Sequence, residues 1–389
     1  MARIQLPDYG RSTLTEVLPA IASHLLAGLP GLPGNAEDCR DVLGIPQARR
    51  YVMVMVDGLG HDLLIRQRFR APYLGSLLEG AIGLTSGVPS TTATSLSSIG
   101  TGTVPGRHGI VGYSFRALGE IINALTWDDR LDPLTFQPQP TWFEKLEAHP
   151  QIAVSTVSLA KFEDSGLTQA ALRGSRFIGL IDENDTSLRI EQIVAASRVG
   201  ERSFVYAYER RLDHAGHGMG CLSEAWNQTL DEIDAWIEQL RSALDPQTCL
   251  IVTGDHGMVD VPSNHQIVIE DTPVLTNGLD LIGGEGRLRQ LYCDRPDEVA
   301  TRWRRWLGER AIVRTRDEAI DEGWFGTVDD RMRDRIGDVL VALLGDWAIM
   351  TLTRPGELTL VGQHGSLTPE EMRVPLLIDQ LAAPAKRSP

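Results

Sequence analysis

Cysteine is scarce in this chain of 389 residues, and the four that occur stand far apart. No two of them form a Cys-x-x-Cys pair, the spacing typical of zinc ribbons and thiol redox sites. Cys249 and Cys293 lie within apolar runs, where a thiol is usually buried. The sequence therefore predicts buried free thiols and argues against a disulfide-stapled scaffold.

Positive charge is also scarce: the chain has 37 Lys and Arg residues and 52 Asp and Glu residues, so its formal net charge is −15. A surface of this sign repels long polyanions, so we do not expect the chain to coat DNA or RNA. A local positive site made by metal ions would still attract one small phosphate ester. The expected partner is therefore a small molecule and no long nucleic acid.

A long uninterrupted hydrophobic run is missing as well. The most apolar stretch, residues 17–33, is broken by Pro19 and Pro30, and no other segment approaches the roughly 18 apolar residues of a membrane span. Asp8 and Glu16 precede it, where an export signal carries positive charge. We expect an amphipathic surface helix here, no insertion into a membrane, and a cytoplasmic location.

What the chain does contain is a regular alternation of strand-like and helical patterns. The helical periodicity is clearest over residues 222–244, where apolar residues recur along one face. Such alternation is typical of βαβ units around a mainly parallel sheet. We therefore predict an α/β fold with helices on both faces of a central sheet. The clearest strands are residues 51–56, 152–157, 203–208, 248–253 and 374–378.

Residues 272–354 differ from the rest because they are rich in Arg and Trp. We predict that they form a small α+β lobe, inserted into the larger domain near the substrate pocket. The larger, catalytic domain then comprises residues 1–271 and 355–389. The expected elements of the lobe are a helix near 296–308 and strands near 288–293, 311–314 and 347–352.

Three predicted strands deliver an acidic residue to the same edge of the sheet. Asp57 directly follows its strand, Asp255 stands two residues after the strand at 248–253, and Asp213 stands shortly after the strand at 203–208. In open α/β sheets the ligand crevice lies at the carboxyl ends of the strands. One Asp before a glycine would be explained as a helix cap, but three such strand ends indicate a shared site.

Three histidines with glycine neighbours complete the set of candidate ligands. His217 stands four residues after Asp213, so one helical turn brings both to the same side. His214 is a competing ligand, but its position points it away from that face. His256 lies in an Asp-His-Gly segment, and His364 lies in a Gln-His-Gly segment after the lobe.

Together these side chains offer six carboxylate or imidazole ligands, enough for two ions with three ligands each. Two ions about 4 Å apart form the clamp used for in-line phosphoryl displacement. Mixed Asp and His ligation suits Zn²⁺, with Mn²⁺ or Fe²⁺ as alternatives. The six are Asp57, Asp213, His217, Asp255, His256 and His364.

A run of hydroxyl side chains after Pro89 supplies candidate nucleophiles. The proline marks the start of a helix, where free N–H groups favour anionic oxygen and phosphate. Ser90 and Thr91 are expected to cap the first turn. Thr92 and Thr94 differ by about 200° around a helix, so they cannot both face the metals. Thr91 is nearer in angle and remains the rival of Thr92.

These motifs, taken in order, resemble the alkaline phosphatase superfamily, and most closely its nucleotide pyrophosphatase/phosphodiesterase branch. The matching segments are VDGLG, PSTT, TGTVPGRHGIVG, DHAGH, GDHG and QHG. The resemblance covers residues 50–270 and 355–380. It implies an alkaline phosphatase-like α/β fold and a two-metal site around a covalent hydroxyl nucleophile.

The resemblance also implies individual roles. It selects Thr92 as the nucleophile and as a group bound to metal, because the branch places its threonine between a preceding proline and a following Thr-Gly pair at the spacing found here. One ion would bind the nucleophile, and the other would bind the attacking water. The implied ligand sets are Asp57, Asp255 and His256 for the first ion, and Asp213, His217 and His364 for the second.

Two further candidate residues bear on how the substrate is bound. Tyr113 stands where members of the branch carry an Asn that hydrogen-bonds a phosphate oxygen, and a phenol can still donate one hydrogen bond. Lys161 lies where related phosphomonoesterases place a Lys that binds a dianionic phosphate, but Glu163 replaces the second basic residue of that pattern. A solvated surface lysine is the favoured account of Lys161, with substrate contact as the alternative.

The expected function is a two-metal-dependent phosphodiesterase or nucleotide pyrophosphatase that acts on a small phosphate ester or nucleotide through a covalent phosphothreonine intermediate. A phosphomonoesterase or phosphonate hydrolase on the same scaffold is the nearest alternative. A non-catalytic, metal-stabilised binding protein is the alternative of another class. The retained nucleophile and the six ligands argue against this last class, because an inactive relative has no need of open metal positions.

Overall fold

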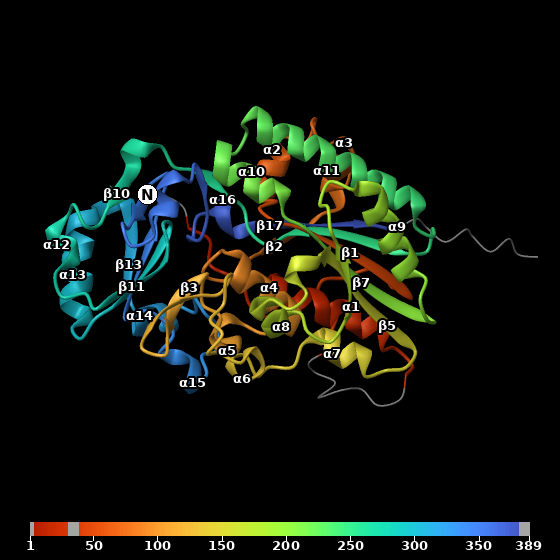
Figure 1. The fold of residues 1–389 in the computed structure, drawn as a ribbon, viewed down its shortest axis with the longest axis horizontal. Helices are drawn as coiled ribbons and strands as arrows, with labels where there is room; N and C mark the ends of the chain where they lie inside the picture. Colours follow the sequence, from red (N-terminus) through yellow and green to blue (C-terminus); the bar gives the residue numbers. More distant parts are fainter. Residues whose placement is uncertain (1–3, 30–38, 381–389) are drawn as a thin grey trace, which may run out of the picture.

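The computed structural model describes residues 4–29 and 39–380 and contains one central sheet of seven strands (Figure 1). Its strands are β1 (Arg50–Val56), β2 (Ile82–Thr85), β5 (Ile152–Leu159), β6 (Arg176–Leu180), β7 (Arg202–Glu209), β8 (Cys249–Gly254) and β17 (Arg373–Asp379). The order across the sheet is β2-β17-β8-β1-β7-β5-β6. Strand β17 runs in the direction opposite to that of the other strands of this sheet. The predicted mainly parallel sheet is therefore confirmed.

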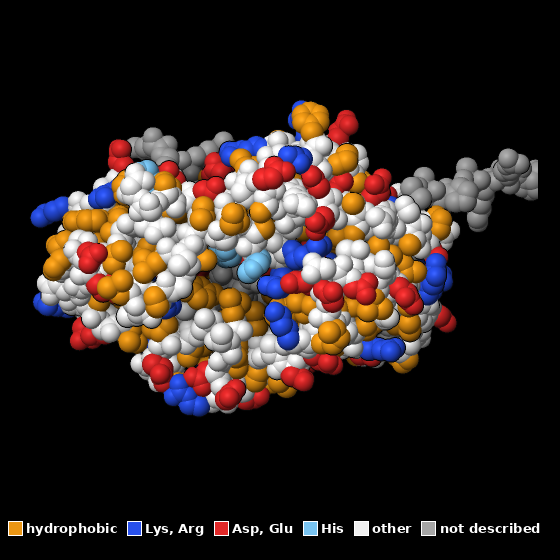
Figure 2. All heavy atoms as spheres, turned by 45° about the horizontal axis from the view of Figure 1, so that its top comes forward, with side chains coloured by type: hydrophobic (Ala, Val, Ile, Leu, Met, Phe, Trp, Pro, Cys, Tyr) orange, Lys and Arg blue, Asp and Glu red, His pale blue; other side chains and the backbone are white. Residues whose placement is uncertain are grey.

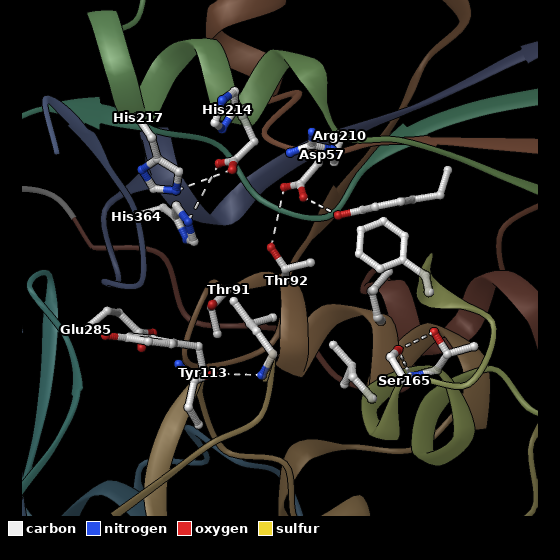
Figure 3. A pocket seen from close by; sticks show the side chains of 18 of the residues that line it. Asp57, Thr91, Thr92, Tyr113, Ser165, Arg210, His214, His217, Glu285 and His364 are labelled. Atoms are coloured by element: carbon white, nitrogen blue, oxygen red, sulfur yellow. Dashed lines mark hydrogen bonds and ion pairs between the residues drawn. The ribbon is translucent and has the colours of Figure 1, made fainter. Parts of the chain in front are cut away.

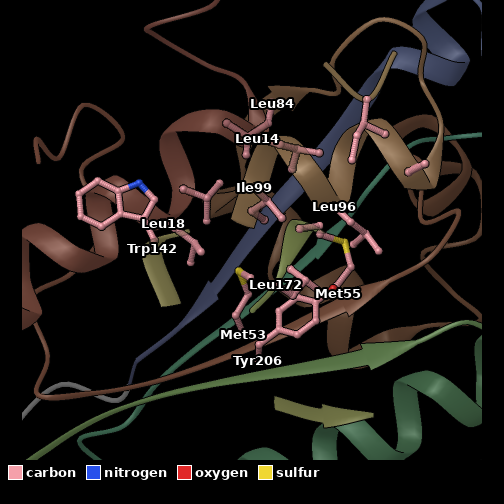
Figure 4. Close-up of a cluster of buried hydrophobic side chains, with 14 of the residues drawn as sticks. Leu14, Leu18, Met53, Met55, Leu84, Leu96, Ile99, Trp142, Leu172 and Tyr206 are labelled. Carbon is pink, nitrogen blue, oxygen red and sulfur yellow. The ribbon is translucent and has the colours of Figure 1, made fainter. Parts of the chain in front are cut away.

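Strand β1 shows why both faces of the sheet are covered. Its residues from Tyr51 to Val56 are all buried, and successive side chains enter two different cores. Met53 and Met55 pack in the core drawn in Figure 4, together with residues of α1 (Val17–Leu25), α4 (Thr92–Thr101) and α7 (Trp142–Glu147). Val52 and Val54 pack in the core that contains α9 (Thr186–Ser197) and α11 (Glu224–Ala243). The prediction of helices on both faces is confirmed.

The N-terminal helix differs from the expected amphipathic surface helix. Residues 17–25 do form α1, but Leu18, Ile21 and Leu25 have no exposed surface. The helix packs against α4 and α7 because apolar residues occupy nearly all of its faces. Residues 30–33 of the apolar stretch lie outside the described residues. Among the helices of the described residues, none has the length and hydropathy to cross a bilayer.

A second, smaller sheet lies beside the central one, at the left of Figure 1. Its antiparallel strands are, in order across the sheet, β11 (Leu281–Glu285), β12 (Leu288–Tyr292), β14 (Val339–Leu343) and β13 (Ala311–Thr315). Helix α13 (Pro296–Leu307) covers it and buries Trp303. Strand β10 (Gln266–Val268) pairs with β15 (Ala348–Met350), so structure shared with this lobe begins before residue 272. The division of the chain at residues 272 and 354 stays a prediction.

Candidate active site

Three adjacent parallel strands of the central sheet end at the same level. Val56 at the end of β1 pairs with Glu209 of β7 and with Gly254 of β8. Asp57 directly follows β1, and Asp255 directly follows β8. The backbone N–H of Gly58 donates to Oδ1 of Asp255 over 2.9 Å, which ties the two strand ends together.

Helix α10 (Arg211–Met219) follows β7 and carries Asp213 and His217 one turn apart. Nε2 of His217 lies 3.3 Å from Oδ2 of Asp213. Gly58 has a φ of +76°, and a Cβ at this position would lie 3.1 Å from the Cα of Asp213. Glycine therefore allows the end of β1 to approach α10 closely. His214 is exposed on the same helix and reaches the rim of the pocket.

The histidine after the lobe reaches the site through a short pairing. Strand β16 (Gly362–Gln363) pairs with β9 (Val259–Asp260), which follows β8 by a few residues. His364 comes next, and its Nε2 lies 3.7 Å from Oδ1 of Asp213. Its ring stacks on the ring of His256 with centroids 3.6 Å apart.

Asp57, Asp255 and His256 form the first cluster of possible ligands. Nε2 of His256 lies 3.3 Å from Oδ1 of Asp57 and 3.5 Å from Oδ2 of Asp255. The hydroxyl of Thr92 lies 3.4 Å from Oδ1 of Asp57 and 3.2 Å from Nε2 of His256. The structure thus brings the expected nucleophile to the expected first ligand set (Figure 3).

The second cluster is arranged around Asp213. In the described part of the chain, Asp213, His256 and His364 place ligand atoms within 4.8 Å of one another. His256 therefore lies between the two clusters, and His217 joins the second through its contact with Asp213. All six expected ligands meet in one region, and their assignment to two separate ions stays a prediction.

Backbone carbonyl groups orient all three histidine rings. A carbonyl oxygen can only accept a hydrogen bond, so Nδ1 of each ring carries a proton, and Nε2 faces the carboxyl groups as the possible ligand atom. This orientation is the one that a metal site needs. The three bonds are His217 Nδ1 to Gly362 O (2.7 Å), His256 Nδ1 to Gly257 O (2.9 Å) and His364 Nδ1 to Ser90 O (2.9 Å).

The carboxyl groups are crowded and buried, which controls their pKa values. Burial raises the pKa of Asp255 to about 7, and the charge of Asp57 contributes in the same direction. Burial and the same charge raise the pKa of Asp213 well above its usual range. Burial opposes the ionisation of Asp57 too, but hydrogen bonds from His256 and Tyr208 outweigh it and lower the pKa.

The unpaired atoms of this region fit divalent cations. Oδ1 of Asp213 and Oδ2 of Asp255 are buried and have no hydrogen-bond partner among the described residues. Burial lowers the pKa of His217 and His364, so these rings are neutral and able to coordinate. Buried, unpaired carboxylate oxygens next to neutral imidazoles are costly without a cation, and they match the ligands that Zn²⁺ prefers.

Thr92 is the first residue of α4, and Thr91 is its N-cap residue. The expected side-chain capping is wrong, because no side chain caps this helix. The Ser90 hydroxyl instead donates to Ser366 O over 2.8 Å and accepts from the N–H of Gly365 over 3.2 Å. It therefore holds the segment that carries His364, while the start of α4 is left without a side-chain cap beside the Thr92 hydroxyl.

A pocket of about 580 Å³ opens over the two clusters and Thr92. Histidine side chains are visible in the hollow of the molecular surface in Figure 2. One wall is apolar and aromatic, and the opposite wall is polar. The apolar wall includes Leu96, Phe162, Leu167, Leu172, Phe177 and Tyr208, and the polar wall includes Tyr113, Glu285, Arg354, Glu357 and Gln363.

The two expected substrate-binding residues differ in position. Tyr113 lines the polar wall, where its hydroxyl donates a hydrogen bond to Glu357. Lys161 is exposed, and its ammonium lies 5.0 Å from the centroid of the Phe162 ring. Phe162 lines the pocket but Lys161 does not. The structure thus brings Tyr113 to the site and leaves Lys161 at the surface, as the favoured account of this lysine expected.

Tyr208, Glu285 and Arg354 are among the residues of the site that the sequence did not single out. The hydroxyl of Tyr208 donates to Oδ2 of Asp57, and Glu285 and Arg354 of the polar wall both come from residues 272–354, the predicted lobe. The sequence could have indicated Tyr208, since this residue has a polar hydroxyl and lies at the end of a buried strand that leads to the site. It could not have indicated Glu285 and Arg354, because their place in the site depends on tertiary contacts.

Solved structures share the fold. Murine ectonucleotide pyrophosphatase/phosphodiesterase 5 matches with a TM-score of 0.65 and 17% identity, over 84% of this chain and 87% of that chain. An inactive threonine-to-alanine variant of the murine protein, in complex with AMP, matches with a TM-score of 0.65 and 16% identity over 86% and 88%. Phosphonoacetate hydrolase from Sinorhizobium meliloti, in complex with phosphonoformate, matches with a TM-score of 0.65 and 20% identity over 88% and 93%.

Curated sequences match over shorter stretches. GPI ethanolamine phosphate transferase 2 of Eremothecium gossypii is 27% identical over 228 residues, which are 57% of this chain and 26% of the relative. Phosphopentomutase of Shewanella frigidimarina is 26% identical over 178 residues, which are 44% of this chain and 40% of the relative. The chain thus spans about a quarter of the length of the transferase.

The family itself follows from a sequence profile that covers most of the chain. The profile of type I phosphodiesterase / nucleotide pyrophosphatase matches residues 51–367. This range includes Thr92 and all six expected ligands. The chain belongs to the type I phosphodiesterase / nucleotide pyrophosphatase family, whose members hydrolyse phosphoric esters.

Proposed function

We propose that the chain is a two-metal-dependent phosphodiesterase or nucleotide pyrophosphatase with Thr92 as its covalent nucleophile. The observation that carries this proposal is the position of the Thr92 hydroxyl, 3.4 Å from Oδ1 of Asp57 and 3.2 Å from Nε2 of His256. The hydroxyl is partly exposed to the pocket at the start of α4, so a phosphate ester can reach it.

The proposed cofactors are two divalent ions, Zn²⁺ or else Mn²⁺ or Fe²⁺. Asp57, Asp255 and His256 would hold one of them next to Thr92. Divalent ions at such a site lower the pKa of a bound hydroxyl and stabilise charge on phosphate oxygens. The other ion would be held by Asp213, His217 and His364, with His256 beside both sets.

The residues of the chain then perform a double displacement. The Thr92 hydroxyl loses its proton to solvent and its oxygen forms a bond to phosphorus, while the bond to the leaving oxygen breaks on the opposite side and that oxygen takes up a proton from solvent. Free N–H groups at the start of α4 favour the negative charge of the phosphate. A water molecule then attacks phosphorus, breaks the bond to Thr92 and restores its hydroxyl.

The proposed substrate is a small phosphodiester or a nucleotide. The aromatic wall, with Phe162, Phe177 and Tyr208, offers flat apolar surfaces against which a base could pack. The murine relative that was solved with AMP supports this choice. Because Lys161 stays at the surface, the structure offers no Lys at this position for a dianionic monoester.

A cytoplasmic location of the protein also remains a proposal.

Hydrolysis of two aryl phosphates tests the proposal. Purified protein with added Zn²⁺ or Mn²⁺ should cleave bis(4-nitrophenyl) phosphate with a higher kcat/KM than 4-nitrophenyl phosphate. A preference for the monoester would overturn the phosphodiesterase proposal in favour of a phosphomonoesterase. Cleavage of phosphonoacetate in preference to both esters would favour a phosphonate hydrolase instead. If two metal ions bind and none of these compounds is cleaved, a non-catalytic, metal-stabilised binding protein would replace the proposed phosphodiesterase.

A further inference from the structure

Glu285 is a buried carboxyl group that faces the pocket without a hydrogen-bond partner. It ends strand β11 of the lobe and is 8% exposed. Neither of its carboxyl oxygens has a partner among the described residues, although both are buried. A polar group that is buried without a hydrogen-bond partner destabilises the fold. The backbone N–H of Tyr113 lowers the pKa of Glu285, but no described residue completes a hydrogen bond to either carboxyl oxygen. A ligand of the pocket is therefore the partner to look for.

Neighbouring groups of the chain are engaged elsewhere. Among the charged groups around Glu285, Arg289 lowers its pKa most. The guanidinium of Arg289 nevertheless donates its hydrogen bonds to Ile349 O, Gly284 O and Glu357. Burial raises the pKa of Glu285 to about 8, with Arg289 opposing this effect and Glu357 adding to it. The two metal-ligand clusters of the described residues do not include Glu285.

Arg354 lines the same pocket and has a donor without a hydrogen-bond partner among the described residues. Its Nη1 donates to the Ser114 hydroxyl over 2.9 Å, and its Nε lies 2.8 Å from Oε1 of Glu357. Its Nη2 is buried and has no hydrogen-bond partner within the part of the chain that the structure describes. Arg354 is near enough for its charge to lower the pKa of Glu285. The polar wall therefore offers one donor and one carboxyl group.

The charges of this wall decide between ligand classes. An ammonium group would meet the guanidinium groups of Arg289 and Arg354, and an anion would meet the carboxyl groups of Glu285 and Glu357. A hydroxyl group carries no charge, accepts from the guanidinium, and can donate to or accept from the carboxyl group of Glu285 in either of its protonation states. Two neighbouring hydroxyl groups satisfy both unused partners at once.

The wall also adjoins the proposed reaction centre. A Cβ on Gly365 would lie 2.5 Å from Cγ of Glu285, so Glu285 packs against the residue that follows the expected ligand His364. Figure 3 shows Glu285 and Tyr113 on one side of the pocket, with Thr92 between them and Asp57. A substituent on the phosphorus atom would extend from Thr92 into the pocket that Glu285 lines.

We propose that Glu285 and Arg354 form a polyol subsite, which binds vicinal hydroxyl groups on the substituent that stays on the scissile phosphate. The substrate class is then a phosphodiester of a glycerol or sugar alcohol type, or a nucleoside bound through its ribose hydroxyls. This inference rests on the proposed phosphodiesterase function and names the part of the substrate that the lobe recognises.

Four phosphodiesters with a common 4-nitrophenyl leaving group test the subsite. Their second substituent is 2,3-dihydroxypropyl, propyl, 2-carboxyethyl or 2-aminoethyl. The dihydroxypropyl ester should have a kcat/KM about 10-fold above the propyl ester, as expected for one or two hydrogen bonds to otherwise unpaired buried groups. In Glu285→Ala this ratio should fall to within about twofold of unity. The exposed Glu309 of the lobe supplies the matched control Glu309→Ala, in which the ratio should equal that of the parent.

Calorimetry on Thr92→Ala provides a second readout that needs no turnover. 2,3-Dihydroxypropyl phosphate should bind about 10-fold more tightly than propyl phosphate, and Glu285→Ala in this background should remove the difference. Equal affinities, or a preference for the carboxyethyl or aminoethyl compound in either assay, would overturn the subsite. If no ester is cleaved but the binding preference is present, the proposed function fails while the polyol subsite stands.

Discussion

The hydroxyl of Tyr208 donates a hydrogen bond to Oδ2 of Asp57, at the point where β7 and β1 end side by side. Groups that hydrogen-bond a ligand carboxylate fix its orientation, and their loss typically weakens metal binding 10- to 100-fold. Tyr206 lies on the same face of β7, and its buried hydroxyl has no hydrogen-bond partner among the described residues. Tyr206 therefore provides the control for a variant that removes the hydroxyl of Tyr208.

We expect Tyr208→Phe to weaken binding of Zn²⁺ by about 10-fold or more, as measured by competition with a chromogenic chelator. Tyr206→Phe should leave the affinity within about twofold, because the hydroxyl that it removes has no hydrogen-bond partner in the described part of the chain. The aromatic ring remains in both variants, so the packing of the core is unchanged. Equal losses in the two variants would show that the bond to Asp57 is not the cause.

Thr92→Ala should lower turnover by at least roughly 10³-fold, because it removes the proposed nucleophile. The bound metal, measured by plasma mass spectrometry, should stay within about 20% of the parent, since six other ligands remain. Thr91→Ala is the matched control one residue earlier, and its kcat should stay within about 10-fold of the parent. Substantial activity in Thr92→Ala together with its loss in Thr91→Ala would make Thr91 the nucleophile.

Metal binding should depend on pH through Asp213 and Asp255. Both have pKa values raised in the folded chain, Asp255 from 3.8 to about 7. A raised carboxyl pKa means that the metal-free fold loses stability as pH rises above about 4 towards 7. A divalent ion removes this loss because it pairs with the ionised carboxylates.

The rise in Tm on adding Zn²⁺ should therefore be larger at pH 7.5 than at pH 5.5, as measured by differential scanning fluorimetry. Asp255→Asn should reduce this pH dependence, and Asp271→Asn, at an exposed position, should not. An increase in Tm that is the same at both pH values would contradict proton displacement by the metal.

Glu285→Gln should stabilise the chain most at alkaline pH. The parent pKa is raised from 4.5 to about 8, so the parent loses stability as pH rises through this window, and a neutral Gln does not. The free energy of unfolding should be higher in the variant by about 1–3 kcal/mol at pH 8.5 and by less at pH 5. Urea titrations at both pH values measure it, and Glu309→Gln should show no such trend.

Helix α4 should tolerate no side chain at Gly100. A Cβ there would lie 1.8 Å from the backbone oxygen of Ala171 in α8 (Gly166–Ala171). Gly100→Ala should cost about 1–3 kcal/mol of unfolding free energy and lower kcat, because α4 carries Thr92. At Gly80 a Cβ meets nothing within 4 Å, so Gly80→Ala should stay within about 0.5 kcal/mol of the parent. Similar losses at both positions would contradict this packing argument.

The sequence predicted strands β1, β5, β7, β8 and β17 of the central sheet because they are largely buried on both faces and appear as continuous apolar runs. It missed β2 and β6 at the two edges of this sheet, which are short and partly exposed. It did not identify β11 and β14 of the lobe. The segment LIGGE of β11 contains two glycines, and the run VLVAL of β14 cannot be told from a buried helical segment by periodicity alone. The helix at residues 17–25 was found, but its burial depends on α4 and α7.

The candidate site, too, could be predicted from the sequence only in part. Asp57, Asp255 and His256 were identified because they stand at strand ends, where parallel topology collects ligands. Ser90 was misjudged as a cap because its partners, Gly365 and Ser366, are distant in the sequence. The unpaired carboxyl of Glu285 was out of reach for a related reason, since local sequence does not show which buried group lacks a partner.

The order of strands in the central sheet has a consequence for synthesis. Strand β17 lies between β2 and β8 and pairs with both, yet it comes last in the chain among the strands of the described residues. Until residues 373–379 leave the ribosome, the edges of β2 and β8 expose unpaired N–H and C=O groups. Such edges pair readily with other chains. A product cut before residue 373 should therefore aggregate, and refolding of the whole chain should give lower yields as the protein concentration rises.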